Sequence, residues 1–211
     1  MLTEPATHTL LRISGSHVFR AAPEWVAPSL QRAPWVVVRR AYVRDGLVPV
    51  GVRGDTRDKR FASWLSPNDI LEQLTPQDLV ASRAWSHASR RDAIPALAAL
   101  DVVAGIMRER GFERAWGPIG SVGFELASGC TTATLDSDLD IIVAMEWLPA
   151  LEDARRLREA LALLPVNADV LLETSGGGGG AVVLAEYVRS PEAYVVRTKA
   201  GPILFSDGGS K

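Results

Sequence analysis

The chain has few of the residues that build disulfide frameworks and metal centres, with one cysteine and three histidines among 211 residues. The single Cys130 excludes an internal disulfide and any cysteine-rich metal site, and it fits a reducing compartment. His8, His17 and His87 do not show the short spacing of a histidine metal motif. We therefore expect these histidines to be structural or to lie on the surface.

Long apolar runs and an excess of charge are absent as well. No apolar stretch approaches the roughly 20 residues that span a bilayer. Residues 1–11 lack the basic-then-apolar pattern of a secretory signal. The formal net charge of −2 gives no general attraction to nucleic acid. We therefore expect a cytoplasmic protein that binds neither membranes nor nucleic acid.

Residues 1–85 have the pattern of a small α+β domain. Two β-rich segments, residues 35–43 and 47–52, flank a turn at residues 44–46 whose glycine can take a positive φ. Two helix starts, each an N-cap residue followed by proline, come next: Ser66-Pro67 and Thr75-Pro76.

Residues 86–211 alternate helix and strand patterns. Apolar residues recur every three or four positions between residues 92 and 110, which predicts a long helix ending at Gly111. A second amphipathic helix begins near Pro149, and a hairpin is expected near the C-terminus. The other predicted strands cover residues 114–117, 139–145 and 167–173.

The five consecutive glycines at residues 176–180 lack the Gly-Lys-Ser/Thr ending of a phosphate loop and favour a flexible connector. The whole pattern predicts an α+β fold. We expect a small N-terminal α+β domain, residues 1–85, and then a catalytic domain, residues 86–211, with a mixed sheet flanked by helices.

The strongest chemical signal is Gly120-Ser121 followed by Asp138-Leu139-Asp140. Side chains at alternate strand positions share a face, so the Cα atoms of Asp138 and Asp140 would lie about 6–7 Å apart. Such a carboxylate pair can share divalent cations, while the glycine lets backbone N–H groups approach a phosphate. The pattern favours phosphoryl or nucleotidyl transfer.

Two acidic residues compete for the third position of this site. Asp169 falls in the later strand, where it could ligate a metal or help to deprotonate an attacking hydroxyl. Asp136 follows the same alternation and leaves Asp136/Asp138 open as an alternative pair. Asp138 and Asp140 directly adjoin the apolar residues 141–143, which favours them as the metal-binding pair.

Basic residues are concentrated between positions 39 and 60. They can form an ordinary solvated surface, or a clamp for an anionic cofactor or an acidic partner. Arg53, together with the later Lys199, is a candidate phosphate contact. The concentration comprises Arg39, Arg40, Arg53, Arg57, Lys59 and Arg60.

The Gly-Ser turn with its Asp-x-Asp strand resembles the nucleotidyltransferase signature of the DNA-polymerase-β-like superfamily, over about residues 92–173. Further segments resemble the phosphoribosyl-dephospho-CoA transferase family, the malonate decarboxylase holo-[acyl-carrier-protein] synthases. They extend the similarity over nearly the whole chain. These segments are residues 33–40, 45–54, 60–62, 184–187 and 201–202.

This resemblance implies transfer of phosphoribosyl-dephospho-CoA from 2′-(5″-triphosphoribosyl)-3′-dephospho-CoA to a serine of the apo acyl-carrier subunit of malonate decarboxylase. Diphosphate is the leaving group. The implied alternatives are a general nucleotidyltransferase acting on a small molecule or another protein, and a non-catalytic relative that binds the carrier protein.

The resemblance also implies roles for individual residues. Gly120 and Ser121 would bind the phosphates of the donor. Pro118-Ile119, directly before them, departs from the family pattern. The implied ligands of Mg²⁺ (or Mn²⁺), which also act in catalysis, are Asp138, Asp140 and Asp169.

Overall fold

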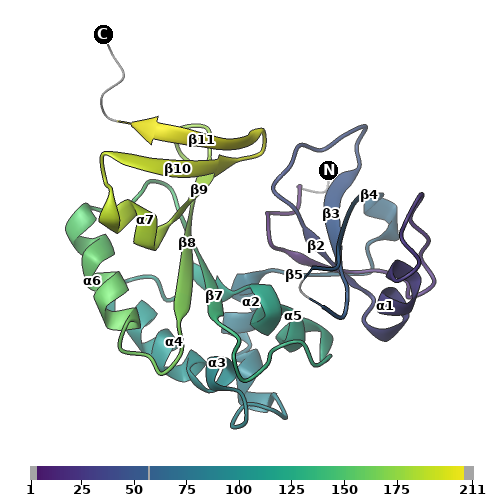
Figure 1. The fold of residues 1–211 in the computed structure, drawn as a ribbon, viewed down its shortest axis with the longest axis horizontal. Helices are drawn as coiled ribbons and strands as arrows, with labels where there is room; N and C mark the ends of the chain where they lie inside the picture. Colours follow the sequence, from purple (N-terminus) through teal and green to yellow (C-terminus); the bar gives the residue numbers. More distant parts are fainter. Residues whose placement is uncertain (1–3, 57, 207–211) are drawn as a thin grey trace.

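The structure is a computed structural model that describes residues 4–56 and 58–206. Arg57, one of the basic residues named above, lies outside the described residues. Two sheets lie side by side, with most of the helices around the second one (Figure 1). The α-helices are α1 (Val26–Arg32), α2 (Pro76–Ala81), α3 (Pro95–Ala98), α4 (Leu100–Glu109), α5 (Gly120–Ser128), α6 (Leu151–Leu161) and α7 (Leu184–Arg189). Two short 3-10 helices are η1 (Pro67–Asp69), at the predicted helix start Ser66-Pro67, and η2 (Ala84–His87).

The first sheet is antiparallel, with the strand order β4-β3-β2-β1-β5. Its strands are β1 (Leu10–Arg12), β2 (Trp35–Val38), β3 (Val48–Arg53), β4 (Arg60–Leu65) and β5 (Glu72–Leu74). The predicted hairpin is confirmed, because β2 pairs with β3 in the register Val38 opposite Val50. Asp45 and Gly46 both have positive φ, at 52° and 75°, as a tight turn requires.

The second sheet has the order β11-β10-β9-β8-β7-β6. Its strands are β6 (Trp116–Pro118), β7 (Leu139–Met145), β8 (Ala168–Thr174), β9 (Gly180–Val183), β10 (Ala193–Thr198) and β11 (Gly201–Ser206). β7 and β8 are parallel, and every other neighbouring pair is antiparallel. The predicted mixed sheet and the α+β class are therefore confirmed.

One local prediction is wrong. The helix expected over residues 92–110 is divided into α3 and α4, and it begins only at Pro95. Ile94 has φ −111° and ψ 113°, because a residue before proline is pushed out of the helical region. Of the five glycines, residues 176–179 form the turn that connects β8 to β9, residues 177–179 all have positive φ, and Gly180 begins β9. The flexibility of this connector stays a prediction.

The two faces of the second sheet have different surroundings. One face is buried against α4 and α6 by Ile141 and Val143 of β7 and by Val170 and Leu172 of β8. The alternate residue Asp140 projects from the opposite face. That face turns toward the first sheet, whose own core lies under α1.

A smaller apolar cluster joins the two halves of the chain. Leu10 and Trp35 of the first sheet pack with Leu79 of α2 and Phe124 of α5, and all four are buried. The predicted boundary at residues 85 and 86 stays a prediction. None of the helices in the described part of the chain has the length and apolar character needed to cross a membrane.

Gly117 of β6 provides a test of the contact between α2 and the second sheet. A Cβ atom at Gly117 would lie 2.1 Å from the carbonyl oxygen of Pro76, a backbone atom that cannot move alone. We predict that Gly117→Ala lowers the free energy of unfolding by about 1–3 kcal/mol, measured by urea denaturation.

The matched control is Gly105→Ala in α4, where a Cβ meets no atom within 4 Å. This substitution should raise the free energy of unfolding by about 0.5–1 kcal/mol, because alanine favours helix over glycine. Equal stabilities of the two variants would contradict the assigned packing of α2 on β6.

Candidate active site

The start of α5 lies directly against the carboxylate of Asp140. A Cβ atom at Gly120 would lie 2.0 Å from Asp140 Oδ2, and Gly120 has φ +63°. The backbone is tied at the same point, because the Ile119 N–H donates to the Asp140 carbonyl oxygen at 2.9 Å. Glycine is therefore required here both by conformation and by space. The first N–H groups of α5 also have no partner within the helix.

The parallel pairing of β7 with β8 brings two of the predicted carboxylates together. Asp140 is the register partner of Asp169, so their side chains share one face of the sheet. Asp138 immediately precedes β7 and stands two residues before Asp140. Asp136, the alternative partner, is exposed in the turn ahead of the strand.

These carboxylates supply the oxygen ligands that a hard cation prefers. Among the described residues, however, no three His, Cys, Asp or Glu side chains are gathered closely enough to hold a metal ion. Mg²⁺ is commonly held by one or two carboxylates plus substrate phosphates rather than by an all-protein cage. The donor set therefore fits such a cation together with a phosphate ligand.

A buried glutamate fixes the loop that leads into Asp138. Glu125 of α5 accepts hydrogen bonds at 2.8 Å from the backbone N–H groups of Thr132 and Ala133. Arg90 donates to both Glu125 oxygens at 3.1 Å. A further bond holds the loop on α5, because the Thr132 hydroxyl donates to the Ser121 carbonyl oxygen at 2.7 Å. Helix α5 thus positions both ends of the Asp-x-Asp segment.

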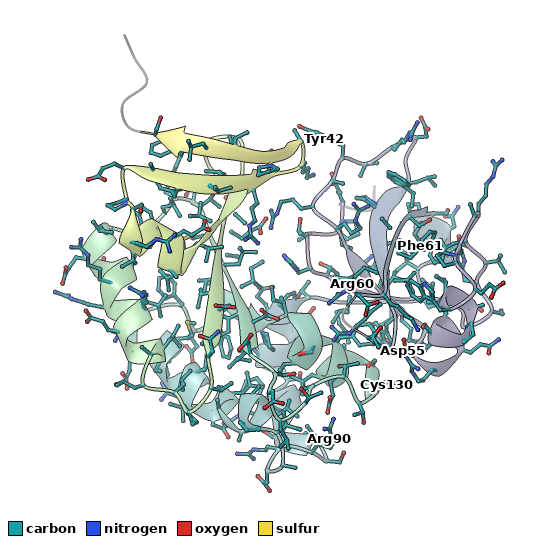
Figure 2. The ribbon with its side chains drawn as sticks, in the orientation of Figure 1. Tyr42, Asp55, Arg60, Phe61, Arg90 and Cys130 are labelled. Carbon is teal, nitrogen blue, oxygen red and sulfur yellow. The ribbon has the colours of Figure 1, made fainter. Side chains whose placement is uncertain are left out.

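A cavity of about 680 Å³ lies between the two sheets. Asp140, Gly120 and Leu171 line it from the second half of the chain, and β2, β3 and β4 line it from the first. Arg60 and Phe61, both labelled in Figure 2, belong to β4 and contribute to this lining. The cationic side chains of the lining are Arg39, Arg40, Arg53, Arg60 and Arg197.

Two of these arginines also contact the other half of the chain. Arg40 forms a two-point ion pair with Glu173 of β8, with Nη1 2.5 Å from Oε1 and a second bond from Nη2 to Oε2. The guanidinium carbon of Arg53 lies 5.9 Å from the ring centroid of Phe124 in α5. The basic concentration noted in the sequence therefore faces the carboxylate strand.

His8 lies in the same cavity, with its backbone in the left-handed region at φ +68°. The backbone N–H of His8 donates to the Val38 carbonyl oxygen at 2.9 Å. Burial, followed by the positive charges of Arg40 and Arg197, lowers the pKa of the imidazole from 6.5 to about 4. His8 is neutral at pH 7, and its surroundings carry a positive potential.

Two predicted phosphate contacts lie apart from the cavity lining. Lys199 Nζ is 2.6 Å from the carboxylate of Glu4, and Lys199 is not among the lining residues. Ser121 is buried in the first turn of α5, next to Gly120 but outside the lining.

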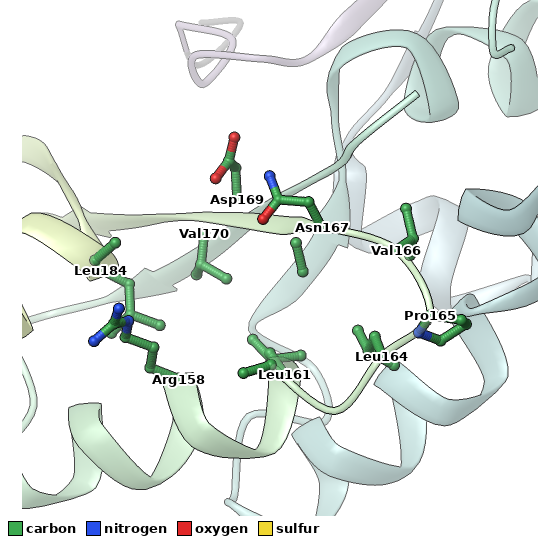
Figure 3. Close-up of a pocket in the computed structure, with 12 residues that line it drawn as sticks. Arg158, Leu161, Leu164, Pro165, Val166, Asn167, Asp169, Val170 and Leu184 are labelled. Carbon is green, nitrogen blue, oxygen red and sulfur yellow. The ribbon is translucent and has the colours of Figure 1, made fainter. Parts of the chain in front are cut away.

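A second cavity, of about 420 Å³, lies between β8, the end of α6 and the start of α7. Asp169 borders it, but Figure 3 shows its carboxylate on the opposite side of β8 from Val170 and Leu161. The Asp169 side chain therefore points to the face that carries Asp140.

Sequence reasoning missed His8, Arg197, Glu125 and Arg90. Arg197 lies far along the chain from the other arginines of the cavity and reaches it only through the pairing of β10 with β9. Glu125 carried a weak signal, because an acidic residue in an otherwise apolar helix needs a partner.

Comparison with known proteins gives matches over both halves of the chain. Residues 6–76 match the N-terminal domain, and residues 79–208 the C-terminal domain, of the phosphoribosyl-dephospho-CoA transferase MdcG. The phosphoribosyl-dephospho-CoA transferase of Pseudomonas aeruginosa is 34% identical over 204 residues, covering 96% of this chain and 93% of the relative.

The transferase of the same name from Azotobacter vinelandii is 33% identical over 208 residues, with coverage of 96% and 93%. That of Pseudomonas syringae pv. tomato is 37% identical over 186 residues, with coverage of 88% and 84%. No solved structure shows a significant match.

The contact between Gly120 and Asp140 predicts an energetic coupling. We expect Gly120→Ala to lower the free energy of unfolding by about 2–4 kcal/mol, from the left-handed backbone and the collision with Asp140. In a double-mutant cycle, Asp140→Ala should relieve part of this loss, giving a coupling of at least about 1 kcal/mol in urea denaturation.

The matched control is Gly129→Ala at the other end of α5. Gly129 has φ +70°, but a Cβ there meets no atom within 4 Å. Gly129→Ala should lower the free energy of unfolding only through the strain of the left-handed backbone. When it is combined with Asp140→Ala, the two changes in this free energy should be additive. Additivity at Gly120 would contradict the assigned contact.

His8 predicts a specific loss of stability in acid. Because its folded pKa of about 4 lies below the unfolded value of 6.5, the unfolded state takes up a proton first as the pH falls. Its contribution is therefore complete above pH 6.5 and declines down to about pH 4, by at most about 3 kcal/mol. His8→Gln should flatten this decline in urea denaturation measured across that range, and profiles parallel to wild type would contradict it.

Proposed function

The chain belongs to the phosphoribosyl-dephospho-CoA transferase family, and from this premise we propose its complete reaction. It moves the phosphoribosyl-dephospho-CoA group from 2′-(5″-triphosphoribosyl)-3′-dephospho-CoA to a serine of the apo acyl-carrier subunit of malonate decarboxylase. As a member of this family the chain is a transferase. The observation that carries the proposal is one cavity that Asp140, the register partner of Asp169, lines from the second sheet and that four arginines line from the N-terminal half of the chain.

The carboxylate wall suits the triphosphate of the donor. Asp138 and Asp140 would hold Mg²⁺ or Mn²⁺, with Asp169 beside them on the same face. The bound cation would neutralise charge that develops on the leaving diphosphate. The unsatisfied N–H groups at the start of α5, where Gly120 lines the cavity, would bind the phosphate oxygens.

The bonds of the transfer are simple to account for. The serine hydroxyl oxygen attacks the α-phosphorus, and the bond from that phosphorus to the bridging oxygen of the β-phosphate breaks. The electron pair leaves with diphosphate, and a phosphodiester joins the carrier to the group. Asp169 is exposed and is the register partner of Asp140, which suits it to accept the hydroxyl proton.

The arginine wall suits the charge of the same donor. Guanidinium groups bind phosphates through paired N–H donors, and five of them line this cavity. Four of them, Arg39, Arg40, Arg53 and Arg60, belong to the N-terminal half of the chain, which therefore has a direct part in substrate binding. Arg197 comes from β10 of the second sheet. The net charge of −2 therefore coexists with a strongly cationic cavity.

We predict that Asp138→Asn and Asp140→Asn each lower the rate of transfer by roughly a hundred- to a thousandfold, because charge on the leaving diphosphate is no longer neutralised. The measurement is mass spectrometry of the apo carrier subunit incubated with the triphosphoribosyl donor and Mg²⁺. Circular dichroism should show that the fold survives.

Asp136→Asn is the matched control, because Asp136 is exposed in the turn outside the strand. This variant should transfer the group at the wild-type rate. A rate as low as that of Asp138→Asn would instead support Asp136 and Asp138 as the metal-binding pair. Normal attachment by Asp138→Asn or Asp140→Asn would overturn the proposed site. Label transfer from a nucleoside triphosphate without the carrier would instead support a general nucleotidyltransferase.

A further inference from the structure

The face of the second sheet that lines the cavity between the two sheets has two polar rows. The first is the Asp140–Asp169 pair. The second lies four residues farther along β8, where Glu173 is the partner of Ala181 and Ala181 is the partner of Arg197. Four residues of extended strand span about 13 Å. Leu171 separates the two rows and lines the cavity between them.

Three arginine side chains gather at the second row: Arg39, Arg40 and Arg197. Arg40 pairs with Glu173, so these two charges compensate each other. Arg197 and Arg39 also line the cavity, and within the described residues neither forms an ion pair with an acidic side chain. The stem of Arg39 lies over Gly51, with Cδ 3.5 Å from the position of a Cβ there.

The pKa of His8 is consistent with a positive electrostatic potential in this region. Apart from burial, the causes that lower its pKa to about 4 are the positive charges of Arg40 and Arg197. Guanidinium groups that face a cavity without a counter-ion favour an anionic ligand, because the ligand removes their mutual repulsion and accepts their N–H donors. This end of the cavity thus has the properties of a second phosphate site, remote from Asp140 and Asp169.

We propose that Arg39 and Arg197 bind the diphosphate of the dephospho-CoA part of the donor. The inference rests on the proposed function, since the donor named there carries a triphosphate and, separately, the diphosphate of dephospho-CoA. Its triphosphate is taken by the carboxylate wall, and two ribose rings separate that group from the diphosphate. A second cationic site in the same cavity matches this arrangement, and it assigns Arg39 and Arg197 to one particular phosphate group of the donor.

The test uses 3′-dephospho-CoA, which has the diphosphate but lacks the triphosphoribosyl group. Its affinity for the full-length protein is measured by isothermal titration calorimetry in EDTA, so that no metal contributes. Arg39→Gln and Arg197→Gln should each weaken binding by roughly ten- to a hundredfold, the loss of one charge-assisted contact. Each variant should also show a shallower dependence of affinity on salt than wild type.

Arg156→Gln is the matched control, because Arg156 lies on α6 outside the cavity and pairs with Glu152. It should bind 3′-dephospho-CoA as wild type does. Wild-type affinity in Arg39→Gln and Arg197→Gln, or an equal loss in Arg156→Gln, would overturn the assignment. Transfer is measured in parallel, so failure of the proposed function appears as absent transfer by the wild-type protein, independently of these affinities.

Discussion

The parallel pairing of β7 with β8 determines where the chemistry of this protein lies. Four apolar side chains of the two strands, Ile141, Val143, Val170 and Leu172, are buried against helices on one face. Each contributes about 1.5–3 kcal/mol, whereas two carboxylates brought together near the surface repel by only about 1–4 kcal/mol. A shift of one residue in β8 would bury Asp169 and expose Val170. The core therefore keeps two acidic residues side by side although they repel.

The opposite face becomes a cavity because the first sheet stands in front of it. Buried contacts among Leu10, Trp35, Leu79 and Phe124 join the two halves at one side of the cavity. The two-point ion pair of Arg40 with Glu173 joins them at the other side. Removing one partner of such a half-buried pair would leave the other charge uncompensated. The loss of stability would be larger than that from breaking an ion pair on the surface. The separation of the walls is thus fixed independently of any ligand.

Sequence reasoning succeeded where the signal was local. The range predicted for β7 is the observed one, because a carboxylate pair followed by a continuous apolar run marks a buried strand. The hairpin of β2 and β3 was found through its turn at Asp45 and Gly46. β1 and β5 have three residues each and carry no periodicity to detect. The predicted long helix overlooked the constraint that Pro95 places on Ile94.

The cavity itself could not be predicted, although four of its five arginines belong to the basic concentration between positions 39 and 60, because the sequence does not show which other residues this concentration faces. His8 precedes β1, Arg39 follows β2 and Arg197 belongs to β10, so only the pairing of the strands brings them to one space. A net charge of −2 conceals this gathering, since total charge says nothing about where charges of one sign collect. The lowered pKa of His8 is consistent with this gathering of charge, because burial and then the positive charges of Arg40 and Arg197 keep the imidazole neutral, and the same positive charges stabilise an anion.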